Sequence, residues 1–159
     1  MKNKTILITG GAGFIGSHLV DALLEQDCDV IVLDNFSTGR PQNLDHVADK
    51  IQLIECDISQ KGKWQDYFKG VDWVFHLGAL ADIVPSIENP NSYYHSNVNG
   101  TFNILEACRK HRVKKIVYSA SSSCYGIPDE YPTKESAEIR PQYPYALTKY
   151  LGEQLIMHW

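Results

Sequence analysis

The sequence predicts an α/β fold in which helices cover both faces of a parallel sheet, an arrangement called doubly wound. Short apolar runs alternate with longer amphipathic stretches from the first residues to the last. Parallel strands need crossover connections, and such amphipathic stretches supply them. The apolar runs also lack in-and-out alternation, which is typical of strands buried on both sides. We therefore expect one doubly wound domain over residues 1–159, with its ligand at the carboxyl ends of the strands.

The elements follow from the pattern in chain order. Five apolar runs are the predicted strands, at residues 5–9, 30–33, 51–55, 71–77 and 114–119. Apolar residues at helical spacing predict a helix over residues 14–26, and Pro90 suits the first turn of a long helix that ends at His111. A final helix begins near Tyr145. Weaker helical patterns cover residues 44–48 and 62–68, and the segments 35–43 and 125–144 are predicted loops.

Composition excludes several classes of protein. With 43% apolar and 21% charged residues, the chain has the composition of a folded globular domain. A net charge of −4 argues against non-specific nucleic-acid binding, and no apolar run reaches the ~18–20 residues that cross a bilayer. The N-terminus lacks a signal-peptide cleavage site. We expect a cytoplasmic domain without metal, because the cysteines lack zinc-ligand spacing: Cys28, Cys56, Cys108 and Cys124.

A glycine-rich turn follows the first strand and precedes the first helix. Its sequence, GGAGFIG, has the spacing G-x-x-G-x-x-G. Glycine permits the sharp turn and a close approach to a diphosphate, whose charge then lies at the N-terminus of the helix. The alternative is a flexible loop, but a strand before the glycines and an amphipathic helix after them favour dinucleotide binding. The predicted contacts are Gly10, Gly13, Phe14, Ile15 and Gly16.

Two acidic residues follow the second and third strands. Asp34 can accept hydrogen bonds from the adenosine ribose hydroxyls and would repel a 2′-phosphate, so it favours NAD over NADP. The alternative interpretation is an aspartate that forms the turn before Asn35. Asp57 could accept from the adenine amino group, with Ile58 alongside the ring, although aspartate is common wherever a strand ends.

Hydroxyl groups near the fifth strand and the final helix suggest redox chemistry. Tyr145 and Lys149 are four residues apart and share one face of a helix. A tyrosine hydroxyl is a poor base at neutral pH, and a nearby cation favours its phenolate form. The alternative is a packed tyrosine beside a solvated lysine. Serines 121–123 follow the fifth strand, where their hydroxyls could contact a reacting sugar oxygen or merely form a polar loop.

The order of these motifs resembles that of the extended short-chain dehydrogenases/reductases, in the NAD-dependent nucleotide-sugar epimerase/dehydratase family. The glycine turn, the segment LDNFSTG at 33–39, NVNGT at 97–101, the serine cluster and Tyr145-x-x-x-Lys149 all stand in the family's order. The resemblance implies that Ser121, Tyr145 and Lys149 are catalytic, and that Ser121, Ser122, Ser123 and Tyr145 contact the substrate. It also implies further cofactor contacts: Asn35, Ser37, Thr38, Gly39, Leu77, Ala79, Asn97, Tyr145 and Lys149.

Two departures from the family's patterns narrow the expected reaction. Ser122 and Ser123 stand where its 4,6-dehydratases carry an Asp-Glu pair, so dehydration lacks its acid and base. Ala81 stands where UDP-galactose epimerases carry a lysine. The expectation is a UDP-sugar 4-epimerase, acting on a UDP-hexose or rather a UDP-N-acetylhexosamine or UDP-uronic acid. The alternatives are an inactive NAD-binding fragment and a dehydratase or dehydrogenase of the same family.

The end of the chain suggests a missing part and a partner. The final helix stops without a C-cap signal, so we expect a truncated domain that lacks the family's C-terminal substrate domain. The resemblance also implies a homodimer that pairs the helix from Asn91 to His111 with the helix from Tyr145 to Trp159. His76 and Cys124 are interpreted as packing residues.

Overall fold

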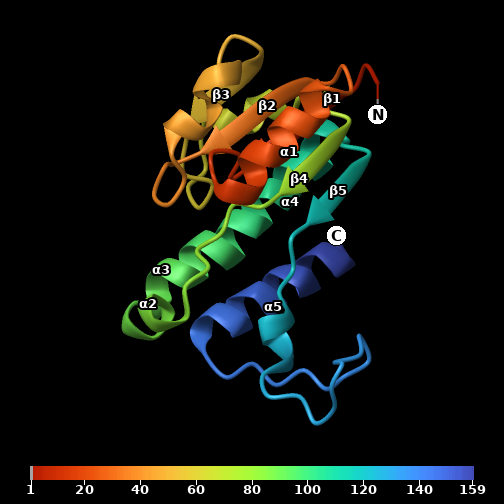
Figure 1. The fold of residues 1–159 in the computed structure, drawn as a ribbon. Helices are drawn as coiled ribbons and strands as arrows, with labels where there is room; N and C mark the ends of the chain where they lie inside the picture. Colours follow the sequence, from red (N-terminus) through yellow and green to blue (C-terminus); the bar gives the residue numbers. More distant parts are fainter. Residues whose placement is uncertain (1) are drawn as a thin grey trace.

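The computed structural model describes residues 2–159 and contains a five-stranded, fully parallel sheet. Its strands are β1 (Thr5–Thr9), β2 (Asp29–Asp34), β3 (Ile51–Glu55), β4 (Trp73–His76) and β5 (Lys115–Tyr118). Their order in space is β3-β2-β1-β4-β5 (Figure 1). The strands β2 and β3 therefore lie on one side of β1, and the chain then crosses back to place β4 and β5 on the other side. This reversal creates a switch point between β1 and β4, and it confirms the doubly wound prediction.

The described residues also form five α-helices. They are α1 (Phe14–Leu24), α2 (Ile83–Glu88), α3 (Pro90–Tyr93), α4 (Gly100–His111) and α5 (Pro144–His158). A π-helical turn, η3 (Tyr94–Asn99), joins α3 to α4, so the predicted long helix from Pro90 to His111 exists but is wound more loosely in the middle. The pattern did not predict α2, because Pro85 lies in its first turn and its apolar residues remain exposed.

The weaker helical predictions coincide with 3₁₀ helices. Residues predicted as short helices form the 3₁₀ helices η1 (Pro41–Val47) and η2 (Lys63–Phe68), and a third, η4 (Ser122–Tyr125), follows β5. Such tight turns fit segments of only six or seven residues. Strand β2 is longer than predicted, whereas β4 and β5 are shorter.

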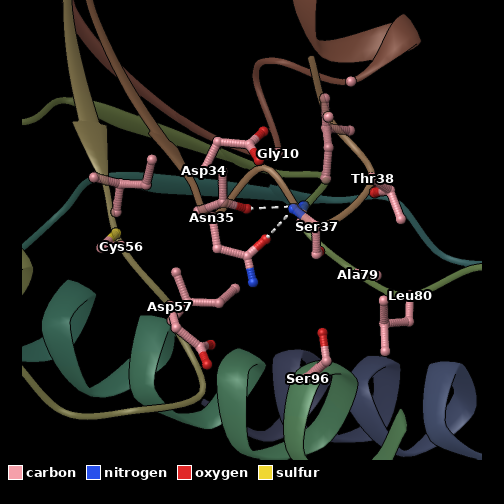
Figure 2. Close-up of a pocket in the computed structure, with 17 residues that line it drawn as sticks. Gly10, Asp34, Asn35, Ser37, Thr38, Cys56, Asp57, Ala79, Leu80 and Ser96 are labelled. Atoms are coloured by element: carbon pink, nitrogen blue, oxygen red, sulfur yellow. Dashed lines mark hydrogen bonds between the residues drawn. The ribbon is translucent and has the colours of Figure 1, made fainter. Parts of the chain in front are cut away.

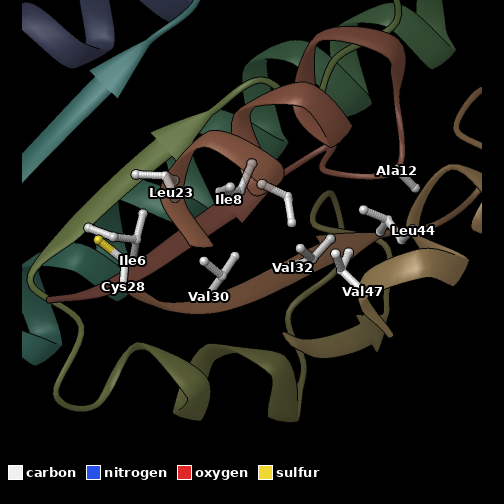
Figure 3. Close-up of a cluster of buried hydrophobic side chains, with 10 residues drawn as sticks. Ile6, Ile8, Ala12, Leu23, Cys28, Val30, Val32, Leu44 and Val47 are labelled. Atoms are coloured by element: carbon white, nitrogen blue, oxygen red, sulfur yellow. The ribbon is translucent and has the colours of Figure 1, made fainter. Parts of the chain in front are cut away.

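The side chains of the central strand point alternately to two separate cores. Ile6 and Ile8 face α1, in a cluster that includes Val32 and Leu23 (Figure 3). Leu7 points to the opposite face, where Ile104 of α4 packs in a second cluster. These three apolar residues of β1 are fully buried. The strand is thus apolar on both sides, as its continuous apolar run predicted.

The long helical segment begins beyond the strand ends and passes behind the sheet, where α4 packs on it, and α5 lies beside this segment (Figure 1). The ring of Phe102, in the first turn of α4, meets the ring of Trp159, which follows α5, edge-on, with centroids 5.3 Å apart. Among the described residues, no helix combines the length and the apolar character that a membrane span requires. This pair of helices carries the tyrosine–lysine motif to the carboxyl edge of the sheet.

Candidate active site

A pocket opens where the strands β1 to β4 end (Figure 2). Most predicted cofactor contacts line it: Gly10, Gly13, Asp34, Asn35, Ser37, Thr38, Gly39, Asp57, Ile58, Leu77 and Ala79. Six further lining residues were not predicted: Thr9, Leu33, Cys56, Gly78, Leu80 and Ser96. Most of these directly flank a predicted residue at a strand end, so the rule that ligands bind at carboxyl ends could have found them.

The glycine turn brings three backbone segments into close approach. Gly10 has φ +71°, and a Cβ atom there would lie 2.8 Å from the backbone nitrogen of Gly78. A Cβ atom on Gly16 would overlap the carbonyl oxygen of Gly10. Larger residues at either position would therefore push the turn apart, which explains two of the three glycines in the motif.

The N-terminus of α1 can receive an anion. Gly13 precedes the helix, no side chain within residues 2–159 caps its first amides, and its first turn holds no acidic residue. The first amide groups of a helix have no intrahelical acceptor and carry partial positive charge. The turn and this helix end thus fit a diphosphate group.

Phe14 and Ile15 take part in this arrangement only through their backbones. Their side chains are 78% and 66% exposed and lie outside the pocket lining. Gly16 also lies outside the lining and is buried beneath the turn. The predicted contacts at these three positions are therefore possible as amide contacts at the start of α1.

Asp34 lines the pocket and also forms the local turn that the sequence suggested as its alternative role. It lines the pocket, and its carboxylate accepts from the amide of Ala12 at 2.9 Å and from the amide of Phe36 at 2.9 Å. The second bond is the local turn of the alternative interpretation. The first ties the glycine turn to the loop that follows β2. Only 8% of the residue is exposed, so the negative charge is held at a fixed place in the wall.

The residues that follow β3 form another part of the pocket wall. Asp57 is exposed, and its carboxylate accepts from the amide of Ser59 at 2.8 Å. The neighbouring Ile58 is buried and lines the same pocket. Burial, together with the charges of Asp57 and Asp34, raises the pKa of the Cys56 thiol to about 12. Cys56 is therefore a neutral wall residue and not a nucleophile.

The predicted catalytic hydroxyls lie together. The Tyr145 hydroxyl donates to Oγ of Ser121 across 3.3 Å, although 24 residues separate them in the chain. Ser121 is also the N-cap of η4, where its Oγ accepts from the amide of Ser123 at 3.2 Å. Ser122 is exposed and Ser123 is half-buried in the same turn. The serine cluster is thus an ordered turn beside the tyrosine.

Lys149 lies one helical turn beyond Tyr145 and is almost fully buried, with 5% exposed. Its Nζ is 4.2 Å from the centroid of the Tyr118 ring, a cation–π contact. Burial lowers the pKa of Lys149 from 10.5 to about 8. The lysine is therefore mostly charged at neutral pH and close to its titration range.

Asn97 connects the pocket to α5. The side-chain amide is buried, accepts from the amide of Leu80 at 2.8 Å and donates to the carbonyl of Leu80 at 3.0 Å. It also donates to Oγ1 of Thr148, next to Lys149, at 3.1 Å. The structure thus does not place Asn97 in the pocket lining, where its neighbour Ser96 lies instead (Figure 2). Its polar atoms are committed to joining the Leu80 wall to α5.

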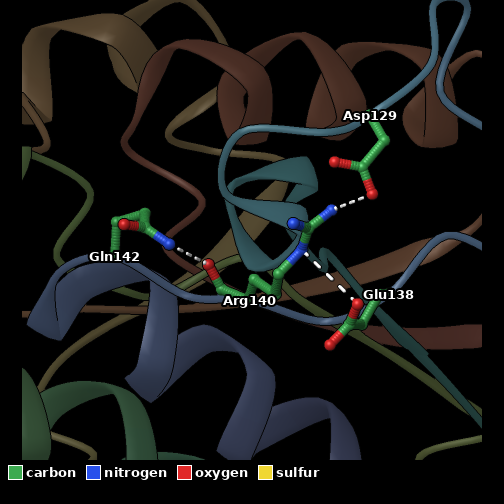
Figure 4. A network of polar contacts seen from close by, with 4 residues as sticks. All are labelled: Asp129, Glu138, Arg140 and Gln142. Atoms are coloured by element: carbon green, nitrogen blue, oxygen red, sulfur yellow. Dashed lines mark hydrogen bonds and ion pairs between the residues drawn. The ribbon is translucent and has the colours of Figure 1, made fainter.

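The loop between η4 and α5 is anchored by Arg140 (Figure 4). Its backbone amide donates to the carbonyl of Cys124 at 2.9 Å, which holds the loop against the serine turn. Its guanidinium donates to Asp129 at 2.6 Å, forms an ion pair with Glu138 at 3.7 Å, and its carbonyl accepts from Gln142. Sequence reasoning missed this anchor, because its partners are scattered through a loop.

Tyr145 and Lys149 lie outside the pocket lining as well, although both were predicted to contact cofactor. Two connections bring their helix to the pocket, namely the Asn97 bridge and the contacts of Lys149 with the sheet. The predicted residues therefore divide into a pocket group at the strand ends and a second group on η4 and α5, which holds the residues predicted to be catalytic.

Comparison with known proteins agrees with this geometry. The profile of the NAD dependent epimerase/dehydratase family matches residues 6–159. The UDP-glucose 4-epimerase of Halalkalibacterium halodurans is 40% identical over 156 residues, which make up 97% of this chain and 45% of that relative. The chain spans about half the length of the curated relatives it matches.

Two solved structures superpose closely. A UDP-N-acetylglucosamine 4-epimerase from Methanobrevibacter ruminantium, in complex with UDP-N-acetylmuramic acid, matches with a TM-score of 0.93 and 36% identity over 99% of this chain and 51% of that chain. The UDP-glucose 4-epimerase of Thermus thermophilus, in complex with NAD, matches with a TM-score of 0.88 and 36% identity over 97% of this chain and 50% of that chain.

Proposed function

Because the chain belongs to the NAD dependent epimerase/dehydratase family, we propose that residues 1–159 form the NAD-binding half of a nucleotide-sugar 4-epimerase. One observation carries the proposal: the Tyr145 hydroxyl contacts the Ser121 hydroxyl at 3.3 Å. Tyr145 lies on α5, the helix that also holds the buried Lys149. Two hydroxyls and a cation at the carboxyl edge of a parallel sheet are suited to moving the proton of an alcohol.

We propose the cofactor contacts from the residues that line the pocket. The amides at the start of α1 would hold the diphosphate, and the fixed carboxylate of Asp34 would accept from the adenosine ribose hydroxyls. The same carboxylate would repel a 2′-phosphate, which favours NAD over NADP. Asp57 and Ile58 would border the adenine. NAD, when bound, supplies the hydride acceptor and donor.

The catalytic group then manages one proton. Tyr145, as phenolate, takes the proton from the sugar 4-hydroxyl while the hydrogen on C4 leaves as hydride, which leaves a 4-keto sugar. Once Tyr145 is a phenolate it no longer donates to Ser121, and the Ser121 hydroxyl beside it is then proposed to donate its own proton in a hydrogen bond to the same sugar oxygen. Return of the hydride to the other face of C4, and of the proton to the oxygen, inverts that carbon with no net redox change.

Lys149 supplies the positive charge that favours the phenolate. It is four residues from Tyr145 on α5, and its pKa of about 8 leaves it mostly protonated at neutral pH. The neighbouring carboxyl end of β5 provides Tyr118, whose ring holds the ammonium in place. The resemblance assigns a second contact of Lys149 to the cofactor ribose.

The substrate is a UDP-sugar, as the names of the matched epimerases suggest. Ala81, an exposed residue after β4, stands where UDP-galactose epimerases carry a lysine, and this favours a UDP-N-acetylhexosamine or a UDP-uronic acid over a UDP-hexose. The experiment is to incubate residues 1–159, and separately the full-length gene product, with UDP-glucose and UDP-N-acetylglucosamine and to quantify C4 epimers.

We expect epimerisation by the full-length protein and none by residues 1–159, because the matched relatives extend to about twice this length. Tyr145→Phe should lower turnover by about 10²–10⁴-fold while NAD still binds. A product that leaves oxidised at C4 or lacks the C6 hydroxyl would instead make the protein a dehydrogenase or a dehydratase. NAD binding without any turnover by the full-length protein would leave only the binding module.

The proposed partner is a second copy of this chain. The helices α4 and α5 leave apolar side chains exposed, among them Phe102, Leu147 and Trp159, and a groove between α3 and α5 is lined by Tyr94 and Leu151. Exposed apolar patches on paired helices are typical of protein interfaces. Sedimentation equilibrium should show a dimer, and a monomer at all concentrations would contradict the pairing.

A further inference from the structure

His76, the last residue of β4, is 1% exposed and connects two walls of the site. Its Nδ1 lies 2.6 Å from Oγ1 of Thr9 on β1, and its Nε2 lies 2.9 Å from Oγ1 of Thr101 on α4. Thr9 lines the cofactor pocket and also accepts from the amide of Gly78 at 3.0 Å. The imidazole therefore spans the distance from the pocket wall to the long helix.

The hydrogen-bond pattern allows only one of the two neutral tautomers of the His76 ring. The Thr101 hydroxyl donates its single proton to the carbonyl of Asn97 at 2.6 Å, because a carbonyl can only accept. Toward His76 it must then accept, so Nε2 carries the proton. Thr9 already accepts from Gly78 and donates its own proton to Nδ1. Every donor in this chain of contacts is thereby matched with one acceptor.

The surroundings of the ring oppose a second proton. Thr9, Thr101 and the Tyr118 ring, whose centroid is 5.5 Å away, offer no negative charge. The charged group that acts on His76 is the Lys149 ammonium, which repels a cation. Burial and this repulsion lower the pKa of His76 to about 3. The imidazole is neutral throughout the physiological range.

We infer that His76 is a positioning residue of the redox site: fixed as the neutral Nε2–H form, it joins the Thr9–Gly78 wall of the cofactor pocket to the Asn97–Thr101 segment that packs on the catalytic helix. The neutral ring also keeps a second positive charge away from Lys149. The consequence for turnover rests on the proposed epimerase function, whereas the protonation state does not.

The protonation state is tested by ¹⁵N NMR of the histidine side chains in residues 1–159, with His76→Asn used to assign the signal. We expect an Nε2–H pattern that stays constant between about pH 5 and pH 9. An Nδ1–H pattern, or a titration within that range, would overturn the inference. This result is independent of whether the protein epimerises sugars, so it separates the two proposals.

The positioning role is tested at Thr101 in the full-length protein. Thr101→Val keeps the side-chain volume but removes the acceptor for Nε2–H, and Thr101→Ser keeps the hydroxyl as a matched control. We expect kcat to fall about tenfold in the valine variant with KM for the sugar changed less than about twofold, together with loss of the pure Nε2–H signal. The serine variant should retain both the original kcat and the Nε2–H signal. Equal kcat in the two variants would refute the role.

Discussion

Replacing Asp34 with asparagine tests how the cofactor wall is held together. Each oxygen of the Asp34 carboxylate accepts from a different backbone amide, those of Ala12 and Phe36, both at 2.9 Å. In Asp34→Asn one of these oxygens becomes an NH₂ group that faces an N–H donor. Rotation of the amide cannot avoid this conflict, because both positions are already opposite donors.

The expected loss follows from those two bonds. A hydrogen bond to a charged group is worth about 1.5–3 kcal/mol, and an unmatched buried donor costs about 1–3 kcal/mol. We therefore expect Asp34→Asn to lower the free energy of unfolding by about 2–3 kcal/mol. In a chain of this size that corresponds to a fall in Tm of roughly 5–10 °C.

The control is Asp57→Asn, a second carboxylate of the same pocket. It is exposed and accepts one bond, from the amide of Ser59, which the oxygen of asparagine can replace. Its expected cost is below about 0.5 kcal/mol. Urea unfolding followed by circular dichroism, without added nucleotide, measures both variants. Equal losses in the two variants would refute the view that Asp34 fastens the glycine turn to the loop after β2.

Three further predictions follow from the site. Gly16→Ala should weaken NAD binding at least about tenfold in calorimetry, because the new methyl group would overlap the carbonyl oxygen of Gly10; unchanged affinity would contradict this account of the turn. Tyr145→Phe removes the hydroxyl that contacts Ser121 and should lower kcat of the full-length protein by about 10²–10⁴-fold with NAD affinity unchanged, whereas retained turnover would remove Tyr145 from the chemistry. Lys149→Met should stabilise the chain at pH 7 by about 3 kcal/mol, because burial lowers the pKa of the lysine from 10.5 to about 8. The unfolded chain binds this proton more tightly, so the cost of the buried charge is present below pH 8 and fades as the pH rises toward 10.5. Urea unfolding at several pH values should show the stability advantage of the methionine variant shrinking over that range. A difference in stability that stays constant with pH would contradict the prediction.

Local patterns made part of the site predictable from the sequence. The strand, the glycines and the helix that form the phosphate turn are adjacent in the chain, and their spacing alone indicates the geometry of Gly10 and Gly16. Tyr145 and Lys149 are likewise one helical turn apart, so their shared face follows from periodicity. The fold class could be predicted for the same reason, since each β-α-β unit has its own local signal.

Contacts between residues in distant segments could not be predicted from the sequence. His76 contacts Thr9, which is 67 residues away, and Thr101, which is 25 residues away, so its bridging role emerges only in the folded chain. Asn97 was expected at the cofactor, yet its amide is committed to Leu80 and Thr148. No periodicity indicates such contacts, because they depend on which strand ends meet.

The most direct test of the central claim is a crystal structure of residues 1–159 with NAD. It should show the diphosphate on the first amides of α1, the adenosine ribose at Asp34 and the nicotinamide ring directed toward the Tyr145 hydroxyl. A diphosphate bound elsewhere, or a nicotinamide out of reach of Tyr145, would contradict the assignment of this edge of the sheet as a hydride-transfer site.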